Sequence, residues 1–362
     1  MVKRILHFQG RMGLGGAESF MMNIFRTVDL SEFVFDFVIY DTYKDVTPYN
    51  DEIKKMGGKI FVLPDPNRHF FKYIQELFRL LRTKNFFAVE NEIYFGGGIN
   101  LLLALICGIK TRVAVSHATS DGKGFTRTHL LLAFFLKKLL ITTATDLVAV
   151  SEDAGNSLFL GKQFLIVPNG IDLAKFVDAK RYRKSNREKM GIEENTVVGI
   201  NIGRLEKQKN QTFLIDLVDS MNQRQKNNFK LFIVGTGSLL DELESLSRAK
   251  GLEDIIVFLG ERTDIDQLLS MSDIFLLPSL YEGLPTVGIE AQAAGLKSIF
   301  SQNISSEIKL TNECLFLPIS SGSFRFWITE IFKSEQIVKT TSRLFFYDNK
   351  VAAKKLMTLY RK

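Results

Sequence analysis

Residues 279–290 of the chain read SLYEGLPTVGIE, and they follow a short apolar run at 273–277. A short apolar run that is followed by a proline is typical of a buried β-strand. The stretch 286–294 has the pattern of a helix, and Gly295 is expected to close it as a C-cap. Pro285 suits the first helical position, where its missing N–H is not needed. These residues therefore predict a strand–loop–helix unit of a parallel α/β sheet.

The same stretch carries two carboxylates, Glu282 in the loop and Glu290 on the first turns of the helix. A helix N-terminus offers free N–H groups and a positive dipole end, so phosphate is its natural ligand. Two acceptor side chains beside an anion site suit a ligand that has both phosphates and hydroxyls, such as a sugar nucleotide. The residues that would line this site are Gly283, Leu284, Pro285 and Thr286. From the spacing alone, a solvated loop acid and an exposed helix glutamate are an equally good interpretation.

The length of 362 residues predicts two domains. Apolar strand-like runs alternate with helical patterns along the chain, which indicates parallel α/β sheets. Strands are expected near 4–9, 34–40, 59–63, 86–90, 111–115 and 146–150, and then near 197–203, 229–235, 255–259, 273–277 and 298–300. A polar, basic stretch from Asp178 to Arg187 is expected to be the linker.

The formal charge of +7 would suit an anionic membrane surface, but no nucleic-acid-binding motif accompanies it, so nucleic acid is not an expected partner. The two cysteines lie far apart in apolar stretches, which favours free thiols in a reducing compartment. The first residues lack the apolar core of a signal peptide, and no run approaches the ~20 apolar residues of a membrane span. We therefore expect a cytoplasmic protein.

A second candidate feature is the stretch INIGRLEKQKN at residues 200–210. The predicted strand delivers Arg204 to its end, and the following loop brings Lys209 back before the next helix. The planar fork of an arginine and the point charge of a lysine can together neutralise a diphosphate. A solvated pair of cations is the alternative.

In the first half, His117 follows a predicted strand at the sheet edge where ligands of α/β proteins bind. A lone histidine is otherwise an ordinary surface or core residue. Glycine-rich turns follow two strands and would let the backbone approach a ligand; their candidate residues are Gly15, Gly16, Gly235 and Gly237. The third glycine of a dinucleotide fingerprint is replaced by Glu18, so NAD is not expected.

Together these motifs resemble retaining glycosyltransferases of the GT-B fold, most closely family 4 in the branch that builds bacterial capsular and exopolysaccharides. The match covers nearly the whole chain in the family's order. It implies two Rossmann-like, doubly wound domains that face each other across a cleft. The first, acceptor-side domain would span 1–177 plus a C-terminal helix at 346–362 that crosses back to it. The nucleotide-sugar domain would span 178–345.

The resemblance also implies roles for individual residues. Glu290 would hold the ribose hydroxyls and Glu282 the sugar hydroxyls, while Arg204 and Lys209 would stabilise the departing diphosphate. His117 would contact the transferred sugar. Backbone contacts to the base are implied for Glu261 and Arg262, and the segment 168–172 would lie between the domains. The donor would be a UDP-sugar, the acceptor a saccharide or lipid-linked saccharide, and neither a metal nor another cofactor is expected.

Two other functions share parts of this pattern. A non-hydrolysing sugar-nucleotide epimerase has the same fold but needs several acid–base side chains around the sugar. A non-catalytic membrane-associated scaffold would only keep the fold. The helix at 130–140 is apolar on nearly every face but contains two lysines. We expect it to be a buried core helix; the alternative is a surface helix that dips into an anionic bilayer on the inner face of the cell membrane.

Overall fold

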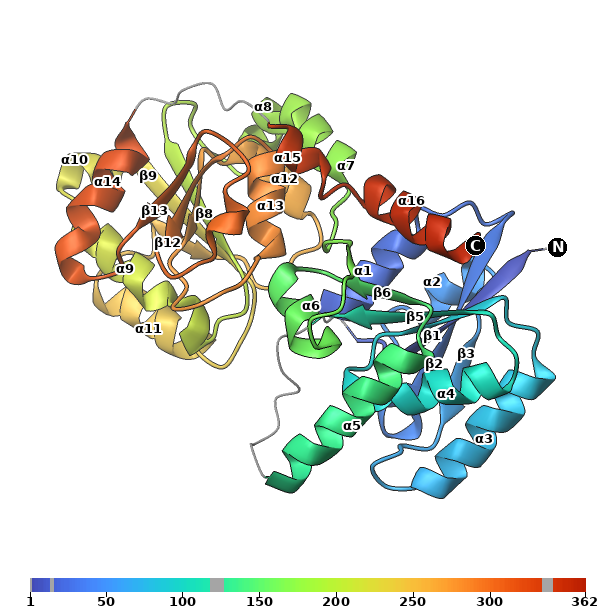
Figure 1. Ribbon diagram of the computed structural model, residues 1–362. Coiled ribbons are helices and arrows are strands. Elements are labelled where there is room, and N and C mark those ends of the chain that lie inside the picture. The colour runs from blue at the N-terminus through green and yellow to red at the C-terminus, as the bar shows by residue number, and fades with distance from the viewer. Residues whose placement is uncertain (1, 14–15, 118–126, 334–340) are drawn as a thin grey trace. The chain divides into compact units, whose positions relative to one another are not determined.

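The computed structural model describes residues 2–13, 16–117, 127–333 and 341–362, which form two compact units (Figure 1). The N-terminal unit comprises Met1–Gly170 and Asn349–Lys362, and the C-terminal unit comprises Ile171–Asp348. The first boundary therefore lies before the position expected from the sequence, within the segment 168–172. The last helix returns to the N-terminal unit, as the sequence predicts.

The N-terminal unit is built on a seven-stranded sheet in which every pairing is parallel, with strand order β3-β2-β1-β4-β5-β6-β7. The strands are β1 (Lys3–Gly10), β2 (Phe33–Tyr40), β3 (Ile60–Leu63), β4 (Ala88–Asn91), β5 (Thr111–Ser116), β6 (Asp146–Ala149) and β7 (Leu165–Ile166). Six of them fall where the sequence predicts a strand. The two-residue strand β7 is too short to leave a hydrophobic pattern.

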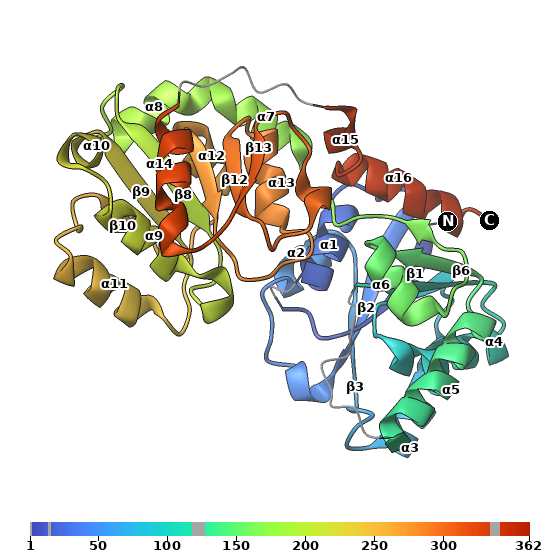
Figure 2. The same ribbon diagram turned by 60° about the vertical axis from the view of Figure 1, so that its left-hand side comes forward.

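Helices cover both faces of this sheet (Figure 2), because its strands bury apolar side chains on both sides. One face carries α1 (Gly16–Phe25), α2 (Asn50–Lys55) and the C-terminal helix α16 (Asn349–Tyr360). The other carries α3 (Phe70–Thr83), α4 (Gly98–Ile106), α5 (Arg127–Thr143) and α6 (Glu152–Phe159). Neighbouring residues alternate accordingly: Ile5 packs toward α1 and Leu6 toward the opposite core.

The C-terminal unit repeats this plan with a six-stranded parallel sheet of order β10-β9-β8-β11-β12-β13. Its strands are β8 (Val197–Ile202), β9 (Phe229–Val234), β10 (Ile256–Phe258), β11 (Ile274–Leu277), β12 (Lys297–Ser301) and β13 (Cys314–Leu317). Only β13 was not predicted.

Helices again cover both faces of the second sheet. On one side lie α9 (Gln211–Asp219), α11 (Leu240–Ala249) and α14 (Phe324–Phe332), with the short α10 (Gln223–Asn227) next to β9. On the other lie α7 (Leu173–Ala179), α12 (Ile265–Met271), α13 (Thr286–Ala293) and α15 (Ser342–Phe345). The helix α8 (Arg183–Lys189) packs against α12.

The stretch expected to be a linker is therefore folded as part of the C-terminal unit. Within it, the buried Arg187 donates to the backbone oxygens of Met271 and Thr196 and also contacts the Asp273 carboxylate. Arg183 donates to the same carboxylate. Two of the basic residues that look like a solvated linker, Arg183 and Arg187, are thus cations that hold α8 to the sheet.

Two local predictions at the ends of helix α13 have different outcomes. Gly295 does end α13 in the left-handed conformation, with φ +77°, but it lies one residue beyond the C-cap, which is Ala294. Pro285 is not the first helical residue. It is the N-cap, with ψ 116°, because the chain is still extended there and the helix begins at Thr286.

Candidate functional site

In both sheets the strand order reverses at one point, between β1 and β4 and between β8 and β11. Ligands of doubly wound sheets bind at the carboxyl ends of the strands beside such a point. In the C-terminal unit the two loops that leave this point are 203–210 after β8 and 278–285 after β11. They contain six of the residues singled out from the sequence: Arg204 and Lys209 in the first loop, and Glu282, Gly283, Leu284 and Pro285 in the second.

Hydrogen bonds join the two loops into one platform. The Leu280 N–H donates to the Gln208 carbonyl at 2.8 Å, and the Gln208 side-chain amide donates to the Tyr281 carbonyl at 2.9 Å. Asn210, which adopts a left-handed φ of 57°, donates from Nδ2 to the Pro278 carbonyl at 3.1 Å. The side chains on these loops are therefore held by a fixed backbone.

The centre of this platform is a direct ion pair between two of the predicted residues. Lys209 Nζ donates to Glu282 Oε1 at 2.6 Å, and Ser279 Oγ donates to the same oxygen at 2.5 Å. Their side chains are only 15% and 10% exposed, so the pair is shielded from water more than a surface salt bridge. An ammonium has three protons and a carboxylate has two acceptor oxygens. Lys209 and Glu282 can therefore keep their bond while each binds a ligand group.

Arg204 is exposed on the same loop as Lys209, and the backbone on either side of it is held by hydrogen bonds to the end of β9 and the glycine turn that follows. An added Cβ at Gly235 would lie 2.1 Å from the Gly203 carbonyl oxygen, and one at Gly237 would lie 2.4 Å from the Leu205 carbonyl oxygen. Glycine is thus required at both positions for close backbone contact with the loop that carries Arg204. The sequence predicts that these glycines line a nucleotide pocket. What the structure shows is that their close contact with this loop leaves no room for a side chain at either position.

Glu290 lies on α13 in a different environment. Burial raises its pKa to about 7; Lys175 on α7 opposes this shift, and Asp266 on α12 adds to it. Lys175 and Asp266 themselves form an ion pair at 3.0 Å. Near neutral pH, Glu290 is therefore poised between a hydrogen-bond donor and an ionised acceptor.

The other residues of this unit that the sequence predicts to bind the sugar donor lie outside this ion pair. Gly283 is exposed, Leu284 packs against the core and Pro285 is buried. Thr286 begins α13, so the free N–H groups of that helix lie at this end. Glu261 and Arg262 are exposed, and Arg262 makes two hydrogen bonds to Asp264, at 2.8 and 2.6 Å.

In the N-terminal unit, Gly16 begins α1, whereas Gly15 lies outside the described residues. His117 directly follows β5, and its side chain is 11% exposed. The structure joins it to a residue that the sequence analysis missed: His117 Nε2 forms a hydrogen bond with Glu92 Oε2. Glu92 follows β4, the strand next to β5.

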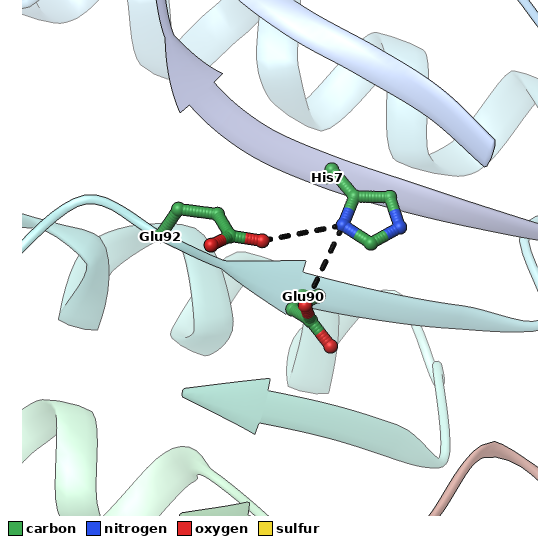
Figure 3. A group of neighbouring side chains, drawn as sticks. All are labelled: His7, Glu90 and Glu92. Carbon is green, nitrogen blue, oxygen red and sulfur yellow. Dashed lines mark hydrogen bonds and ion pairs between the residues drawn. The ribbon is translucent and has the colours of Figure 1, made fainter. Parts of the chain in front are cut away.

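Three buried side chains continue the network from Glu92, and Figure 3 shows two of them, His7 and Glu90. His7 Nδ1 lies 3.4 Å from Glu92 Oε1 and 3.6 Å from Glu90 Oε1. The hydroxyl of Tyr360, at the end of α16, donates to Glu90 Oε2. In the described part of the chain, His7, Glu90 and Glu92 are also the single group of three whose potential metal-binding atoms lie within 4.8 Å of one another. The carboxylates already accept hydrogen bonds from Tyr360 and His117.

Electrostatics distinguishes the two acids. Burial and the neighbouring Glu92 raise the pKa of Glu90 well above its usual value, which favours the neutral form of this acid. Burial alone would also raise the pKa of Glu92, but hydrogen bonds from His117 and His7 outweigh it and lower that pKa to about 2. The network thus holds one buried carboxylate between two imidazoles.

Comparison with known proteins agrees with this geometry. The family "Glycosyl transferases group 1" matches residues 182–308, which contain both loops of the platform. EpsF of Bacillus subtilis, a glycosyltransferase by its name, is 33% identical over 314 residues, 84% of this chain and 81% of EpsF. A UDP-Gal:α-D-GlcNAc-diphosphoundecaprenol α-1,3-galactosyltransferase of Escherichia coli is 25% identical over 322 residues, 86% of this chain and 82% of that enzyme.

Among solved structures, HepE of Anabaena in complex with UDP and glucose superposes with a TM-score of 0.69 at 17% identity, covering 99% of this chain and 97% of HepE. This likeness shows the fold, which is GT-B. The relationship to EpsF shows the family: the chain belongs to the group 1 glycosyltransferases and is an enzyme.

Proposed function

We propose that the protein is a retaining hexosyltransferase that moves a sugar from a UDP-sugar to a saccharide or lipid-linked saccharide during cell-surface polysaccharide synthesis. The observation that carries this proposal is the Lys209–Glu282 pair at the strand-order reversal of the C-terminal unit, 2.6 Å apart and largely shielded from water. A nucleotide sugar needs cations for its phosphates and acceptors for its hydroxyls, and this platform supplies both. The UDP-dependent relative in Escherichia coli supports the choice of donor and of a lipid-linked acceptor.

The chemistry follows from the charges on the platform. When the bond between the anomeric carbon and the diphosphate breaks, negative charge collects on the diphosphate. Lys209, Arg204 and the N-terminus of α13 stabilise that charge electrostatically without a metal ion. The acceptor hydroxyl attacks from the face that the diphosphate leaves, and its proton passes to the departing phosphate oxygen. Glu282 orients the sugar hydroxyls, and Glu290 binds the ribose.

A donor screen tests this function. Nucleotide sugars are compared by thermal shift, because a ligand that binds only the folded protein raises its apparent stability. The stabilising donor is then incubated with and without saccharide acceptors, and the products are analysed. Transfer with retained anomeric configuration supports the proposal. Conversion of the sugar nucleotide without acceptor would instead identify an epimerase, and neither binding nor turnover would identify a scaffold.

We further propose that α5 rests on an anionic membrane surface. The expectation of a buried core helix was wrong: Leu131, Leu132, Phe134 and Phe135 are between 51% and 63% exposed. Lys138 is exposed beside them. Among the described residues, no helix has the length and apolar character needed to cross a membrane. Exposed apolar side chains with a neighbouring cation suit a helix that lies in the interface.

The structure also refines how this membrane contact should be tested. Lys137 does not share the exposed position of Lys138: its Nζ donates to the Ser157 carbonyl at 2.6 Å and lies 5.2 Å from the Tyr94 ring centroid. The informative variant is therefore Phe135→Ser with Lys138→Glu, and Lys55→Glu on α2 is a charge-matched control. The double variant should lose sedimentation with anionic vesicles at low salt. Unchanged sedimentation would remove α5 from the membrane contact.

A further inference from the structure

The sheet of the N-terminal unit brings four ionisable side chains onto one buried face. His7 on β1 is the direct register partner of Glu90 on β4, and Glu90 pairs with Val113 on β5. Because side chains alternate along a strand, Glu92 follows Glu90 on this face and His117 follows Val113. The same face carries α1 and α16. The network is therefore set by strand register.

Glu92 is the residue of this network that contacts His117, the site residue predicted from the sequence. Its two carboxylate oxygens have separate partners, Oε2 with His117 and Oε1 with His7 at 3.4 Å. Its backbone N–H donates to the Phe8 carbonyl at 3.1 Å, which fixes the carboxylate relative to β1. On the other side, Phe20 of α1 packs edge-on against the His117 ring, with centroids 5.4 Å apart.

These contacts assign a proton to one ring nitrogen of His117. An ionised carboxylate can only accept, so Nε2 of His117 carries the proton that it shares with Glu92. The other ring nitrogen, Nδ1, is buried and has no hydrogen-bond partner among the described residues. A partner on one imidazole nitrogen determines the tautomer and orientation of the ring, and thereby what the other nitrogen can do.

We propose that Glu92 is a positioning residue for sugar transfer: it holds the His117 ring by Nε2 so that the ring and its backbone meet the transferred sugar in one orientation. This inference rests on the proposed sugar transfer and on the contact with the transferred sugar that the family resemblance implies for His117. Glu92 itself touches no substrate in this scheme and acts through His117.

A second layer supports Glu92 from behind. His7 is completely buried and lies against Phe35, with ring centroids 4.3 Å apart, so its imidazole cannot move away from Glu92 without opening the core. On its far side, Glu90 accepts a hydrogen bond from the Tyr360 hydroxyl. The end of the C-terminal helix therefore contributes to the orientation of His117 through Glu90, His7 and Glu92.

The decisive measurement is the protonation pattern of the His117 ring by ¹⁵N NMR. The chain contains only four histidines, so selective labelling and a His117→Asn variant give the assignment. In the wild-type protein, Nε2 should carry a slowly exchanging proton. Glu92→Gln, which keeps an acceptor oxygen of the same shape, should retain one ring orientation. Glu92→Ala should give averaged signals and rapid exchange at Nε2.

Kinetics then separates positioning from a purely structural role. Glu92→Ala should lower kcat for transfer about 10- to 100-fold, the range found when a supporting hydrogen bond to a functional histidine is lost. UDP affinity by calorimetry should stay unchanged, and Glu92→Gln should recover part of kcat. Glu52→Gln, a surface carboxylate paired with Arg26 in the same unit, is the control.

Each outcome is informative. Unchanged NMR signals of His117 in Glu92→Ala would overturn the proposal whether or not the protein transfers sugar. Altered signals with normal kcat would overturn the link to catalysis. If Glu92→Ala fails to fold, Glu92→Gln still decides, since a free His117 ring in that variant contradicts the hydrogen bond. A different result would be one metal ion per purified protein molecule, together with loss of the His117 signals when the metal is removed by a chelator. That result would show that these residues form a metal centre and would contradict the hydrogen-bond network.

Discussion

Replacing Glu290 by glutamine should change protein stability and nucleotide affinity in opposite directions. Burial raises the pKa of Glu290 from 4.5 to about 7, so the folded protein prefers the neutral acid. As the pH rises from 4.5 to 7, ionisation therefore removes stability, and above pH 7 the full cost is present. The shift corresponds to at most about 3 kcal/mol, and because the side chain is partly exposed we expect about 1–2 kcal/mol.

Glutamine keeps the shape of the side chain without the charge. Glu290→Gln should therefore melt about 2–6 °C higher than the wild-type protein at pH 8 and at the same temperature at pH 4.5. Differential scanning calorimetry at the two pH values measures this. Glu253→Gln, an exposed carboxylate of the same unit, serves as the control and should show no pH-dependent difference.

The effect on UDP binding should have the other sign. The ionised carboxylate accepts charge-assisted hydrogen bonds from the ribose, and losing them costs about 1–3 kcal/mol, or roughly 5- to 150-fold in Kd. Wild-type affinity should also fall below pH 7, because Glu290 must lose its proton to accept both hydroxyls. The glutamine variant should not show this pH dependence of UDP affinity. Any pH dependence that remains in the variant comes from protonation of UDP itself. Tighter or equal UDP binding by the variant would refute the ribose assignment.

Three further changes test the platform and its support. Arg204→Ala or Lys209→Ala should each lower turnover about 100-fold with an intact circular dichroism spectrum, and near-normal rates would contradict their role at the diphosphate. Gly235→Ala should destabilise the C-terminal unit by more than about 2 kcal/mol in urea unfolding, because φ is +131° and the new Cβ would meet the Gly203 carbonyl. The control is Gly283→Ala, whose Cβ would have open space and which should unfold like the wild type. Arg187→Met should cost about 3 kcal/mol in the same assay, and an unchanged midpoint would mean that α8 is not held by these bonds.

The sequence predicts the parts of the fold that depend on local pattern. Apolar runs locate the strands to within a few residues, and the left-handed residue Gly295 marks the end of α13. Prediction fails where tertiary contacts decide. The basic stretch 178–187 looks solvated because its carboxylate partner, Asp273, lies on a segment distant in sequence.

The candidate site shows the same division. Arg204, Lys209 and Glu282 can be found from the sequence because each follows a strand in a recognisable motif, whereas their ion pair comes from the hydrogen bonds between two loops. Glu90 and Glu92 were missed, although two acids at the end of an apolar strand are a usable signal for a buried polar group. His7 gave no signal, since its partners depend on which strands are neighbours.

The position of Tyr360 has a consequence for how the protein is made. Its side chain lies in the core of the N-terminal unit and bonds to Glu90, yet it is synthesised only after the whole C-terminal unit. During translation, the first 170 residues must wait with an open core while the whole C-terminal unit is synthesised. A chaperone that shields this face would act until Tyr360 has been synthesised, and a premature stop codon shortly before Tyr360 would leave the first unit unfinished.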